Sequence, residues 1–508
     1  MRPFRFTYLW LLLALFPCFL SAQTRTQGTA PKLSFEIGAG AALNEGSYGE
    51  EIVNRGLSPN GFAAFTFDAG FLGFTGQLSA HTDGKYAPFL ADNPSGTLGN
   101  IYFLMDEGGF FSHLGPVTLK AGRFRNFDSI ESPYSLFINS NGIAAPTASI
   151  AYEGPLLFFE TRWIGLTIDS WQKTDAWPSG FPDRAMDLHV FGIRKGNMRI
   201  GFQEATVYSG RRYFDYEYFL NPLPQIFTQY VRGQGGAPWS SDYDDNYVMG
   251  FFVNVKKPGN YSLTAQAFID DLGMFGLAGW TSNPWQVALT LGASIEKPSG
   301  TWAFNIAGAT KYTFAPSTMS SGTENTMAYG YTYFPDTRFD IGWNTPGFQP
   351  KTIAIEDNMI GYKYGENNLA LELSWNKASP FATLAAAFEF RLAGSNSPTN
   401  PWHDLTTDPQ SGFEWLNDPV LEKRFLLSLG GQKNTGPWLF SASLTAGIAL
   451  DALELRAPTP PTGTWPSATS LVDQKSYIFT PTPGNTKPLL NLTLRIAYRL
   501  TKGVRPLP

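Results

Sequence analysis

The stretch that decides the fold is LNLTLRIAYRL, residues 490–500, close to the end of the chain. Successive side chains of an extended strand point to opposite faces, so this stretch has two unlike sides. One side carries Leu492, Leu494, Ile496, Tyr498 and Leu500, and the other carries Asn491, Thr493, Arg495, Ala497 and Arg499. An arginine that faces lipid at mid-membrane depth costs about 2–4 kcal/mol. We therefore expect the apolar side to face lipid, and Arg495 and Arg499 to face the interior of a barrel.

The same alternation recurs along the chain, in residues 260–270, 369–376, 388–392 and 438–450. Glu372, Glu389 and Arg391 fall on the polar sides of these stretches, and we expect them to face the lumen as well. A period of two over about ten residues, repeated many times, is typical of transmembrane β-strands. The strands of a large soluble β-sandwich or β-helix also alternate between apolar and polar residues. Three features favour the membrane: an N-terminal signal peptide, no cysteine after it, and aromatic residues at the ends of the stretches.

Composition limits the alternatives further. Charged residues make up 16% of the 508 residues, against about 25% in an ordinary soluble domain, and aromatic residues reach 15%. The net charge of −5 gives no basic stripe for nucleic acid. No linker divides the chain. Residues 1–22 read as a signal peptide, with an apolar run before a cleavage site after Ala22, and residues 23–508 as one barrel. Cys18, the only cysteine, lies in this peptide; a lipoprotein would acylate it, but Pro17 stands where a small residue is expected.

The number of strands follows from the repeated stretches. Nineteen of them read as strands, at 32–43, 61–69, 71–82, 98–107, 114–123, 147–153, 156–170, 184–194, 198–208, 245–256, 260–270, 285–296, 301–314, 353–363, 368–377, 381–392, 422–432, 437–450 and 489–500. A bacterial barrel needs an even number. Adding a strand at 326–334 gives 20, and dropping the weak one at 147–153 gives 18.

The connections alternate in length. Short turns rich in Gly, Pro and Asn are expected at 195–197, 257–260, 297–300, 365–368 and 433–436. Long segments are expected at 44–60, 83–97, 124–146, 209–244, 315–352, 393–421 and 451–487. The prediction is therefore an all-β protein: a single transmembrane antiparallel β-barrel of 18 or 20 strands, with short periplasmic turns and long extracellular loops.

Nothing in the sequence indicates catalysis. The histidines are too far apart for a metal motif, and no G-x-S-x-G nucleophile turn is present. The acidic cluster at 240–247 could chelate a hard cation, but it lacks the Gly and final Glu of an EF-hand loop, and a solvated loop end explains it as well. We expect no enzyme activity, no cofactor and no metal site.

The most informative loop is residues 209–246, which is unusually aromatic. An exposed loop of this kind packs on itself or on a partner. Folded into the lumen, it would plug the barrel; facing outward, its rings could stack on sugars while its arginines pair with acidic groups. The candidate ligand-binding residues in it are Arg211, Arg212, Tyr216, Tyr218, Arg232 and Trp239.

The order of features over residues 198–275 resembles the capsule-assembly Wzi-like outer-membrane proteins. The matching positions are Glu204, Tyr208, Gly210, Asn221, Pro222, Asp245, Asn246, Asp270 and Asp271. The resemblance implies an 18-stranded, non-catalytic barrel that acts at the cell surface as a lectin-like anchor for capsular or other exported polysaccharide. These residues carry over as motif positions only; Asn221, within the aromatic loop, is also a candidate ligand-binding residue.

Our first functional hypothesis is therefore a surface polysaccharide-binding barrel. The main alternative is an outer-membrane porin for small solutes, and a third is an adhesin or mainly structural barrel. The expected partners are outer-membrane lipid and lipopolysaccharide, surface polysaccharide and the barrel-assembly machinery, with no nucleic acid. The state of the lumen separates the first two hypotheses: inward-folded loops near 209–244 and 315–352 favour an anchor, and an open water column favours a porin.

Overall fold

The computed structural model describes residues 31–45, 56–84, 97–98, 101–167, 183–209, 214–239, 245–271, 284–315, 317–318, 330–334, 354–396, 402–403, 413–456 and 478–503. These ranges contain almost all of the regular structure that the alternating pattern predicts. The predicted signal peptide, residues 1–22, lies outside the described residues.

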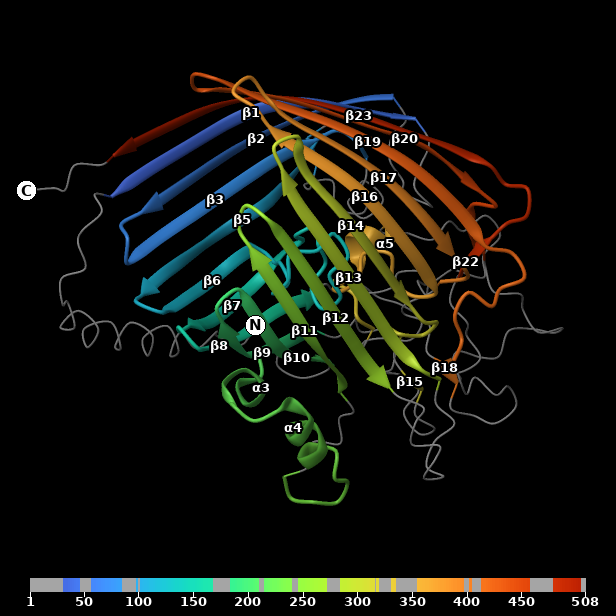
Figure 1. Ribbon diagram of the computed structural model, residues 1–508. Coiled ribbons are helices and arrows are strands. Elements are labelled where there is room, and N and C mark those ends of the chain that lie inside the picture. Colours follow the sequence, from blue (N-terminus) through green and yellow to red (C-terminus); the bar gives the residue numbers. More distant parts are fainter. Residues whose placement is uncertain are drawn as a thin grey trace, which may run out of the picture.

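The chain forms one closed antiparallel β-barrel (Figure 1). Its sheet has 19 strands in the described ranges, of which β4 (Thr97–Leu98) has only two residues and pairs with β5 alone. The other 18 pair in sequence order, and β1 pairs with β23 to close the ring. They are β1 (Lys32–Glu45), β2 (Gly56–Asp68), β3 (Leu72–His81), β5 (Ile101–Leu114), β6 (Val117–Arg125), β7 (Ala144–Glu153), β8 (Leu157–Thr167), β9 (Arg184–Lys195), β10 (Met198–Ser209), β11 (Asn246–Lys257), β12 (Tyr261–Asp271), β13 (Gln286–Lys297), β14 (Gly300–Ala309), β16 (Asn368–Ala378), β17 (Thr383–Ala393), β19 (Glu422–Thr435), β20 (Trp438–Leu450) and β23 (Lys487–Gly503).

The remaining elements are short and lie in the connections between wall strands. Two small pairs form outside the barrel sheet: β15 (Ser317–Thr318) with β18 (Trp402–His403), and β21 (Leu453–Arg456) with β22 (Ile478–Pro481). The described helices are α3 (Tyr216–Leu220), α4 (Gln225–Arg232) and α5 (Ile355–Asn358). None of them has the length and apolar character needed to cross a bilayer.

One end of the barrel carries the short turns, at 69–71, 115–116, 154–156, 196–197, 258–260, 298–299, 379–382 and 436–437. Gly196 (φ 58°) and Gly259 (φ 73°) adopt the left-handed conformation that such turns require and that glycine adopts without a steric penalty. The connections at the other end are long. In outer-membrane barrels the short-turn end is periplasmic and the long-loop end extracellular.

The strand count of 18 confirms the lower of the two predicted numbers, but for a different reason. Residues 147–153 are a full wall strand, β7. The wrong stretch is 353–363, which contains α5 and then Met359 in an isolated bridge with Thr332. The extra strand at 326–334 is also wrong where it is described, because residues 330–334 make only that bridge. The short turn predicted at 365–368 is wrong as well, since this segment enters β16 from the long-loop end.

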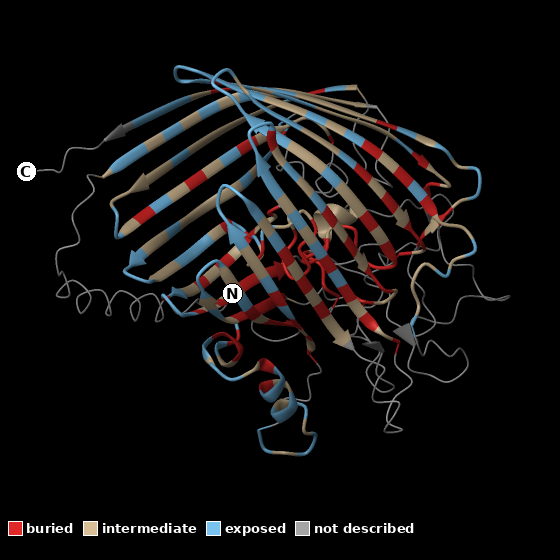
Figure 2. Ribbon diagram, viewed as in Figure 1, coloured by how far each residue is buried: buried red, intermediate tan, exposed pale blue. Residues whose placement is uncertain are grey.

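The two faces of the wall strands are as the alternation predicts. On β23, Leu494, Ile496 and Leu500 are exposed on the outer face. Large apolar side chains, such as Ile37 on β1 and Phe251 on β11, continue this exposed belt around the barrel (Figure 2). The main buried cluster lies inside, where chain segments from the long-loop end pack against the inner face of the wall.

Candidate functional site

Four stretches of chain pack inside the barrel, and we call them together the plug: residues 126–143, 311–315, 330–334 and 354–366. The first connects β6 to β7, and the others belong to the long connection between β14 and β16. Of the connections predicted to fold inward, 315–352 contributes its described residues 330–334. The first stretch comes from the predicted long segment 124–146.

The plug has an aromatic core of its own. Fully buried side chains from different stretches meet in it, namely Tyr134, Leu136, Phe137, Phe314, Tyr331, Met359, Ile360 and Tyr362. They pack against inner-face wall residues such as Phe252 and Phe268. Phe268 lies 5.0 Å, between ring centroids, from both Phe137 and Phe314. Buried aromatic side chains in tilted contact of this kind form a packed core, which excludes water.

Backbone and amide hydrogen bonds hold the stretches together. Asn139 donates from its side-chain amide to the carbonyl oxygens of Glu356 (2.9 Å) and Met359 (3.0 Å). The hydroxyl of Tyr331 donates to the carbonyl of Phe137 (3.0 Å). Segments more than 190 positions apart in the sequence are thereby joined in one unit.

Asp128 fixes the first stretch to the wall. Its carboxylate accepts hydrogen bonds from the backbone N–H groups of Phe137 (2.9 Å) and Ile138 (3.0 Å). It also accepts from the amides of Gln203 on β10 (2.9 Å) and Gln266 on β12 (3.0 Å). Charge-assisted hydrogen bonds are about twice as strong as neutral ones, so this carboxylate orders both the turn and its attachment.

On another part of the wall, two of the predicted lumen-facing residues contact the plug. Glu389 on β17 accepts hydrogen bonds from the hydroxyls of Tyr134 (2.8 Å) and Tyr364 (2.5 Å), and Lys363 Nζ lies 3.8 Å away. Arg391 forms ion pairs with Glu422 on β19 and with Glu356 of α5.

Arg424 on β19 adds a further contact between wall and plug, since its guanidinium lies 3.4 Å from a carboxylate oxygen of Glu356. The Tyr364 ring is flanked by the guanidinium groups of Arg391 (4.7 Å) and Arg424 (5.1 Å). A ring in this position attracts cations through its negative face.

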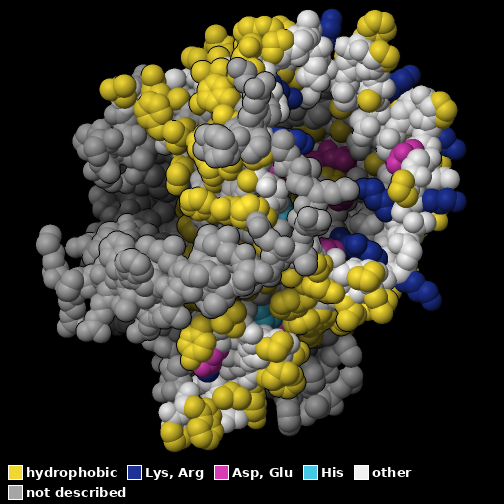
Figure 3. Space-filling view, turned by 90° about the vertical axis from the view of Figure 1, so that its left-hand side faces the viewer, with side chains coloured by type: hydrophobic (Ala, Val, Ile, Leu, Met, Phe, Trp, Pro, Cys, Tyr) yellow, Lys and Arg dark blue, Asp and Glu magenta, His cyan; other side chains and the backbone are white. Residues whose placement is uncertain are grey.

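Beside these charges lies a cavity of about 340 Å³. Its lining combines acidic, basic and small residues, among them Asn141, Glu356, Lys363, Glu372, Glu389 and Arg424. Figure 3 looks toward the barrel from the side of the short turns and shows Lys, Arg, Asp and Glu side chains within its hollow. The cavity therefore suits a small polar molecule better than an apolar one.

Arg495 and Arg499, the arginines of the opening stretch, point inward and share one partner. Glu36 on β1 lies 3.2 Å from Arg495 and 2.7 Å from Arg499. The guanidinium of Arg495 also lies 3.8 Å from the centre of the Phe62 ring. These contacts cross the seam where β23 meets β1, so they belong to barrel closure and lie apart from the plug.

Residues 214–239, which we call the helical hairpin, contain α3 and α4 and lie outside the barrel (Figure 1). The hairpin packs on the outer face of β8–β11: Tyr208 of β10 stacks on Tyr218, and Thr161 of β8 donates to the carbonyl of Phe219 (2.6 Å). Of the two positions considered for this loop, its described part takes the outward one and does not fold into the lumen.

The predicted ligand-binding residues of this loop divide into two groups. Tyr216 and Trp239 expose 64% and 63% of their surface, which leaves both rings free for contact. Tyr218 is fully buried, and its hydroxyl donates to Asp245 (2.6 Å). Asn221 ends α3, where its N–H donates to the Glu217 carbonyl. Arg211 and Arg212 lie outside the described residues.

Arg232 is engaged within the hairpin. It forms ion pairs with Asp215 and with Glu217, the latter at 2.7 Å. Burial alone lowers the pKa of Arg232, but its hydrogen bond to Asp215 and the two negative charges raise the pKa above its usual range. Its charge holds the base of the hairpin together. Ligand binding stays a prediction for all seven residues.

Three positions of the family resemblance, Glu204, Tyr208 and Asp245, lie under the hairpin. Glu204 accepts hydrogen bonds from Tyr247 (3.0 Å) and from the N–H of Gln225 (3.0 Å), and Tyr208 donates to Asp187 (2.9 Å). Asp245 is the partner of Tyr218. Gly210 and the side chain of Asp271 lie outside the described residues. Glu204, Tyr208 and Asp245 attach the hairpin to the wall through Gln225, Asp215 and Tyr218.

The residues that sequence reasoning missed are those of the plug, above all Asp128, Tyr134 and Tyr364. A signal was present in MIGYKYG, residues 359–365, where Met359 and Ile360 are adjacent and both fully buried. A wall strand exposes every second residue to lipid or water, so two adjacent apolar residues followed by two glycines among tyrosines disfavour a wall strand.

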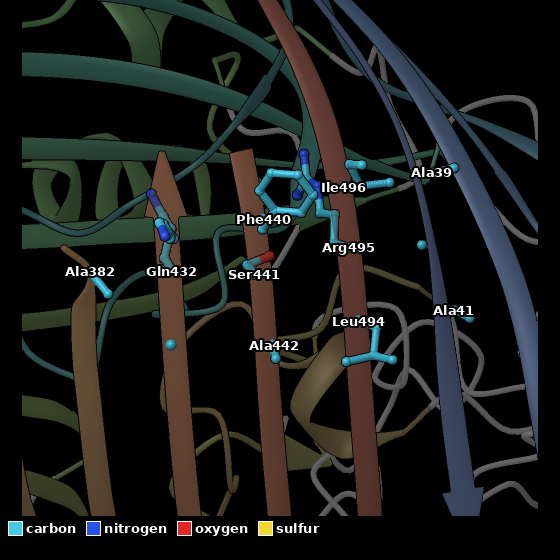
Figure 4. A pocket seen from close by; sticks show the side chains of 13 residues that line it. Ala39, Ala41, Ala382, Gln432, Phe440, Ser441, Ala442, Leu494, Arg495 and Ile496 are labelled. Atoms are coloured by element: carbon cyan, nitrogen blue, oxygen red, sulfur yellow. The ribbon is translucent and has the colours of Figure 1, made fainter. Parts of the chain in front are cut away.

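An apolar depression of about 740 Å³ lies apart from the plug and from the helical hairpin, on the outer face of β19, β20, β23 and β1 (Figure 4). It forms where the small residues Ala39, Ala41 and Ala442 lie beside the larger side chains of Phe440, Leu494 and Ile496. Among the residues that the structure describes, no three His, Cys, Asp or Glu side chains converge to hold a metal ion.

Comparison with known proteins identifies the fold. No protein-family profile matches the sequence, and no curated protein matches it. Among solved structures, the chain is similar to Wzi of Escherichia coli, described as an outer-membrane protein involved in group 1 capsule assembly and a carbohydrate-binding β-barrel, with a TM-score of 0.50 and 10% identity over 99% of this chain and 90% of Wzi.

Weaker similarities extend to OccAB4 of Acinetobacter baumannii (TM-score 0.43, 7% identity, 94% of this chain and 99% of the other). OprD of Pseudomonas aeruginosa is similar at a TM-score of 0.42 and 10% identity, over 94% and 97% of the two chains. The chain has the fold of outer-membrane β-barrels.

Proposed function

We propose that this protein is a non-catalytic outer-membrane barrel that binds exported or capsular polysaccharide at the cell surface. The observation that carries the proposal is the plug. Its fully buried aromatic core, and the ion pairs of its Lys363 with Glu389 and of its Glu356 with Arg391, occupy lumen space that a diffusion pore would leave to water. A barrel filled in this way serves better as a rigid platform for its extracellular loops than as a wide channel.

The hairpin supplies a sugar-contacting surface in this proposal. Tyr216 and Trp239 expose broad rings at its two ends, at the end of the barrel that is extracellular in outer-membrane barrels. Aromatic rings stack on the apolar faces of sugars while their polar atoms remain available for hydrogen bonds. Arg211 and Arg212, next to the hairpin in the sequence, are proposed to pair with acidic groups of the polysaccharide.

Similarity to Wzi supports the same proposal, that the barrel binds polysaccharide. The fold is shared at a TM-score of 0.50, and Wzi is described as a carbohydrate-binding barrel involved in capsule assembly. The property belongs to Wzi, and it enters here as a reason to test polysaccharide first.

A selective channel for small polar solutes is the second candidate. The observation in its favour is the charged cavity of about 340 Å³ beside Lys363, Glu372 and Arg424, which has room for one small solute. The two candidates differ in what they predict for ion flow and for polysaccharide retention.

The first experiment measures conductance of the purified protein in a planar lipid bilayer. We expect small or rare currents. Large, steady single-channel currents would contradict the anchor proposal and favour the channel.

The second experiment measures polysaccharide that stays on washed cells against polysaccharide in the medium. Cells that carry Tyr216→Ala together with Trp239→Ala are expected to release more of it than wild-type cells. The matched control is Phe381→Ala, which removes an exposed ring in the turn 379–382 at the opposite end of the barrel. Equal retention in all three strains, with equal amounts of barrel in the membrane, would rule out a role for these two rings.

A further inference from the structure

The outer face of the wall changes character under the helical hairpin. On β12, the outer positions from Tyr261 to Ile269 are apolar or aromatic at every second residue. On β10, the first three outer positions, Met198, Ile200 and Phe202, are apolar or aromatic, and the next outer position is Glu204. Five residues of a strand tilted by about 40° span about half of the roughly 25 Å apolar band of an outer-membrane barrel.

Polar residues occupy the next two outer positions of β9 and of β10. They are Asp187 and His189 on β9, and Glu204 and Thr206 on β10, and all four are fully buried. His189 Nδ1 lies 3.2 Å from Glu204 Oε1. Facing acyl chains directly, such groups would cost several kcal/mol.

Helix α4 covers this polar surface with its own polar side. Gln225 is buried, its side-chain carbonyl accepts a hydrogen bond from Thr206 (2.8 Å), and its backbone N–H donates to Glu204 (3.0 Å). The hairpin is thus inverted relative to a helix of a soluble protein, whose apolar side faces the core.

The other side of the hairpin is apolar and exposed. Its outward residues are Leu220, Leu223, Ile226, Phe227, Tyr230 and Val231, of which Phe227 exposes 57% and Tyr230 69%. Hydrophobic side chains gather at the lower end of the molecule in Figure 3, where α3 and α4 lie in Figure 1. This surface continues the lipid-facing belt of the strands below it, such as Phe251 of β11 and Ile200 of β10.

We propose that the helical hairpin is embedded in the outer leaflet of the membrane, with the acyl chains of lipids contacting the apolar side of α4. It replaces the missing half of the apolar belt on β9 and β10, while its polar side satisfies the wall groups beneath it. Helices with one apolar and one polar side lie in membrane interfaces in this way. The proposal is independent of polysaccharide binding.

Fluorescence quenching in vesicles tests the proposal. In a Cys18→Ser background, which removes the only cysteine, a bimane label is attached at Phe227→Cys or Tyr230→Cys in the refolded full-length barrel. The vesicles contain phosphatidylcholine with a nitroxide on its acyl chain. Phe251→Cys, in the lipid-facing belt, is the control for lipid contact, and Thr486→Cys, exposed at the long-loop end, is the control for water.

We expect nitroxide lipid to quench the labels at 227 and 230 roughly as strongly as the label at 251, and iodide to quench only the label at 486. Quenching of the hairpin labels by iodide, with no effect of nitroxide lipid, would overturn the proposal, because the hairpin would then project into water. Protection from both quenchers would overturn it too, since the surface would then be covered by protein.

Discussion

The hydroxyl of Tyr134, in the plug, donates a 2.8 Å hydrogen bond to the carboxylate of Glu389 on β17, which lies 255 positions later in the chain. Burial, and then the negative charge of Glu389, raises the pKa of Tyr134 well above its usual range. The hydroxyl therefore stays protonated and remains a donor at any pH at which the cell grows. This contact joins the first stretch of the plug to a second part of the wall, apart from the β10 and β12 residues that bind Asp128.

Replacement of Glu389 by Ala is expected to loosen the plug. The hydroxyls of Tyr134 and Tyr364 lose their acceptor, and a buried group left unpaired costs about 1–3 kcal/mol. We expect Glu389→Ala to give longer and more frequent openings in a planar bilayer, with a lower urea midpoint of unfolding. Glu372→Ala is the control, because Glu372 faces the same lumen but hydrogen-bonds with Asn305 of the wall. Identical currents from both variants would show that Glu389 does not hold the plug.

Arginine placed on the two faces of β23 tests the assignment of lipid and lumen. Leu494 is exposed on the outer face, and Leu494→Arg is expected to destabilise the barrel by about 2–4 kcal/mol, because the charge would enter lipid. Thr493→Arg, one position away on the inner face, is expected to change the stability much less. The measurement is the free energy of unfolding in lipid vesicles from denaturant titrations. Equal losses for both variants would be incompatible with the face assignment.

The wall of the barrel was predictable because its environment has a period of two. Lipid on one side and a polar interior on the other impose alternation on every strand, as in residues 490–500, whatever the identity of the protein. The same reason explains the error at 353–363. Residues of the plug are buried on all sides, as Met359 and Ile360 are. An alternating pattern in such a segment therefore does not predict a strand of the barrel wall.

The position of the aromatic loop could not be predicted from its composition. A plug and an outward hairpin both need aromatic residues, and they differ in which side of each element is polar. On α4 the polar residues Gln225 and Thr228 face the wall, and this follows only from the outer polar groups Glu204 and Thr206. The pairing register of β9, β10 and β11 places Glu204 and Thr206 on the outer face, and this register does not follow from the composition of the loop.

Loss of the Tyr218 hydroxyl is expected to free the hairpin from the wall. Tyr218→Phe keeps the stacking on Tyr208 but removes the 2.6 Å hydrogen bond to Asp245, at a cost of about 1–3 kcal/mol for a buried carboxylate. Limited proteolysis in vesicles, followed by mass spectrometry, should show faster cleavage between residues 214 and 239. Tyr216→Phe, which alters an exposed ring, is the control. Unchanged cleavage of Tyr218→Phe would mean that other contacts suffice to hold the hairpin.

A methyl group at Gly361 is expected to separate two stretches of the plug. A Cβ built on this glycine would lie 2.2 Å from the carbonyl oxygen of Leu136, which is far inside contact distance and involves backbone that cannot rotate away. Overpacking of this kind typically costs about 1–3 kcal/mol. Gly361→Ala should therefore lower the urea midpoint and increase the openings in a planar bilayer, as Glu389→Ala does from the wall side. Gly61→Ala on β2 is the matched control, since its Cβ would meet only the Gly38 carbonyl oxygen at an ordinary 3.6 Å. If Gly361→Ala behaved like Gly61→Ala in both measurements, the two stretches would not be in the close backbone contact on which the integrity of the plug depends.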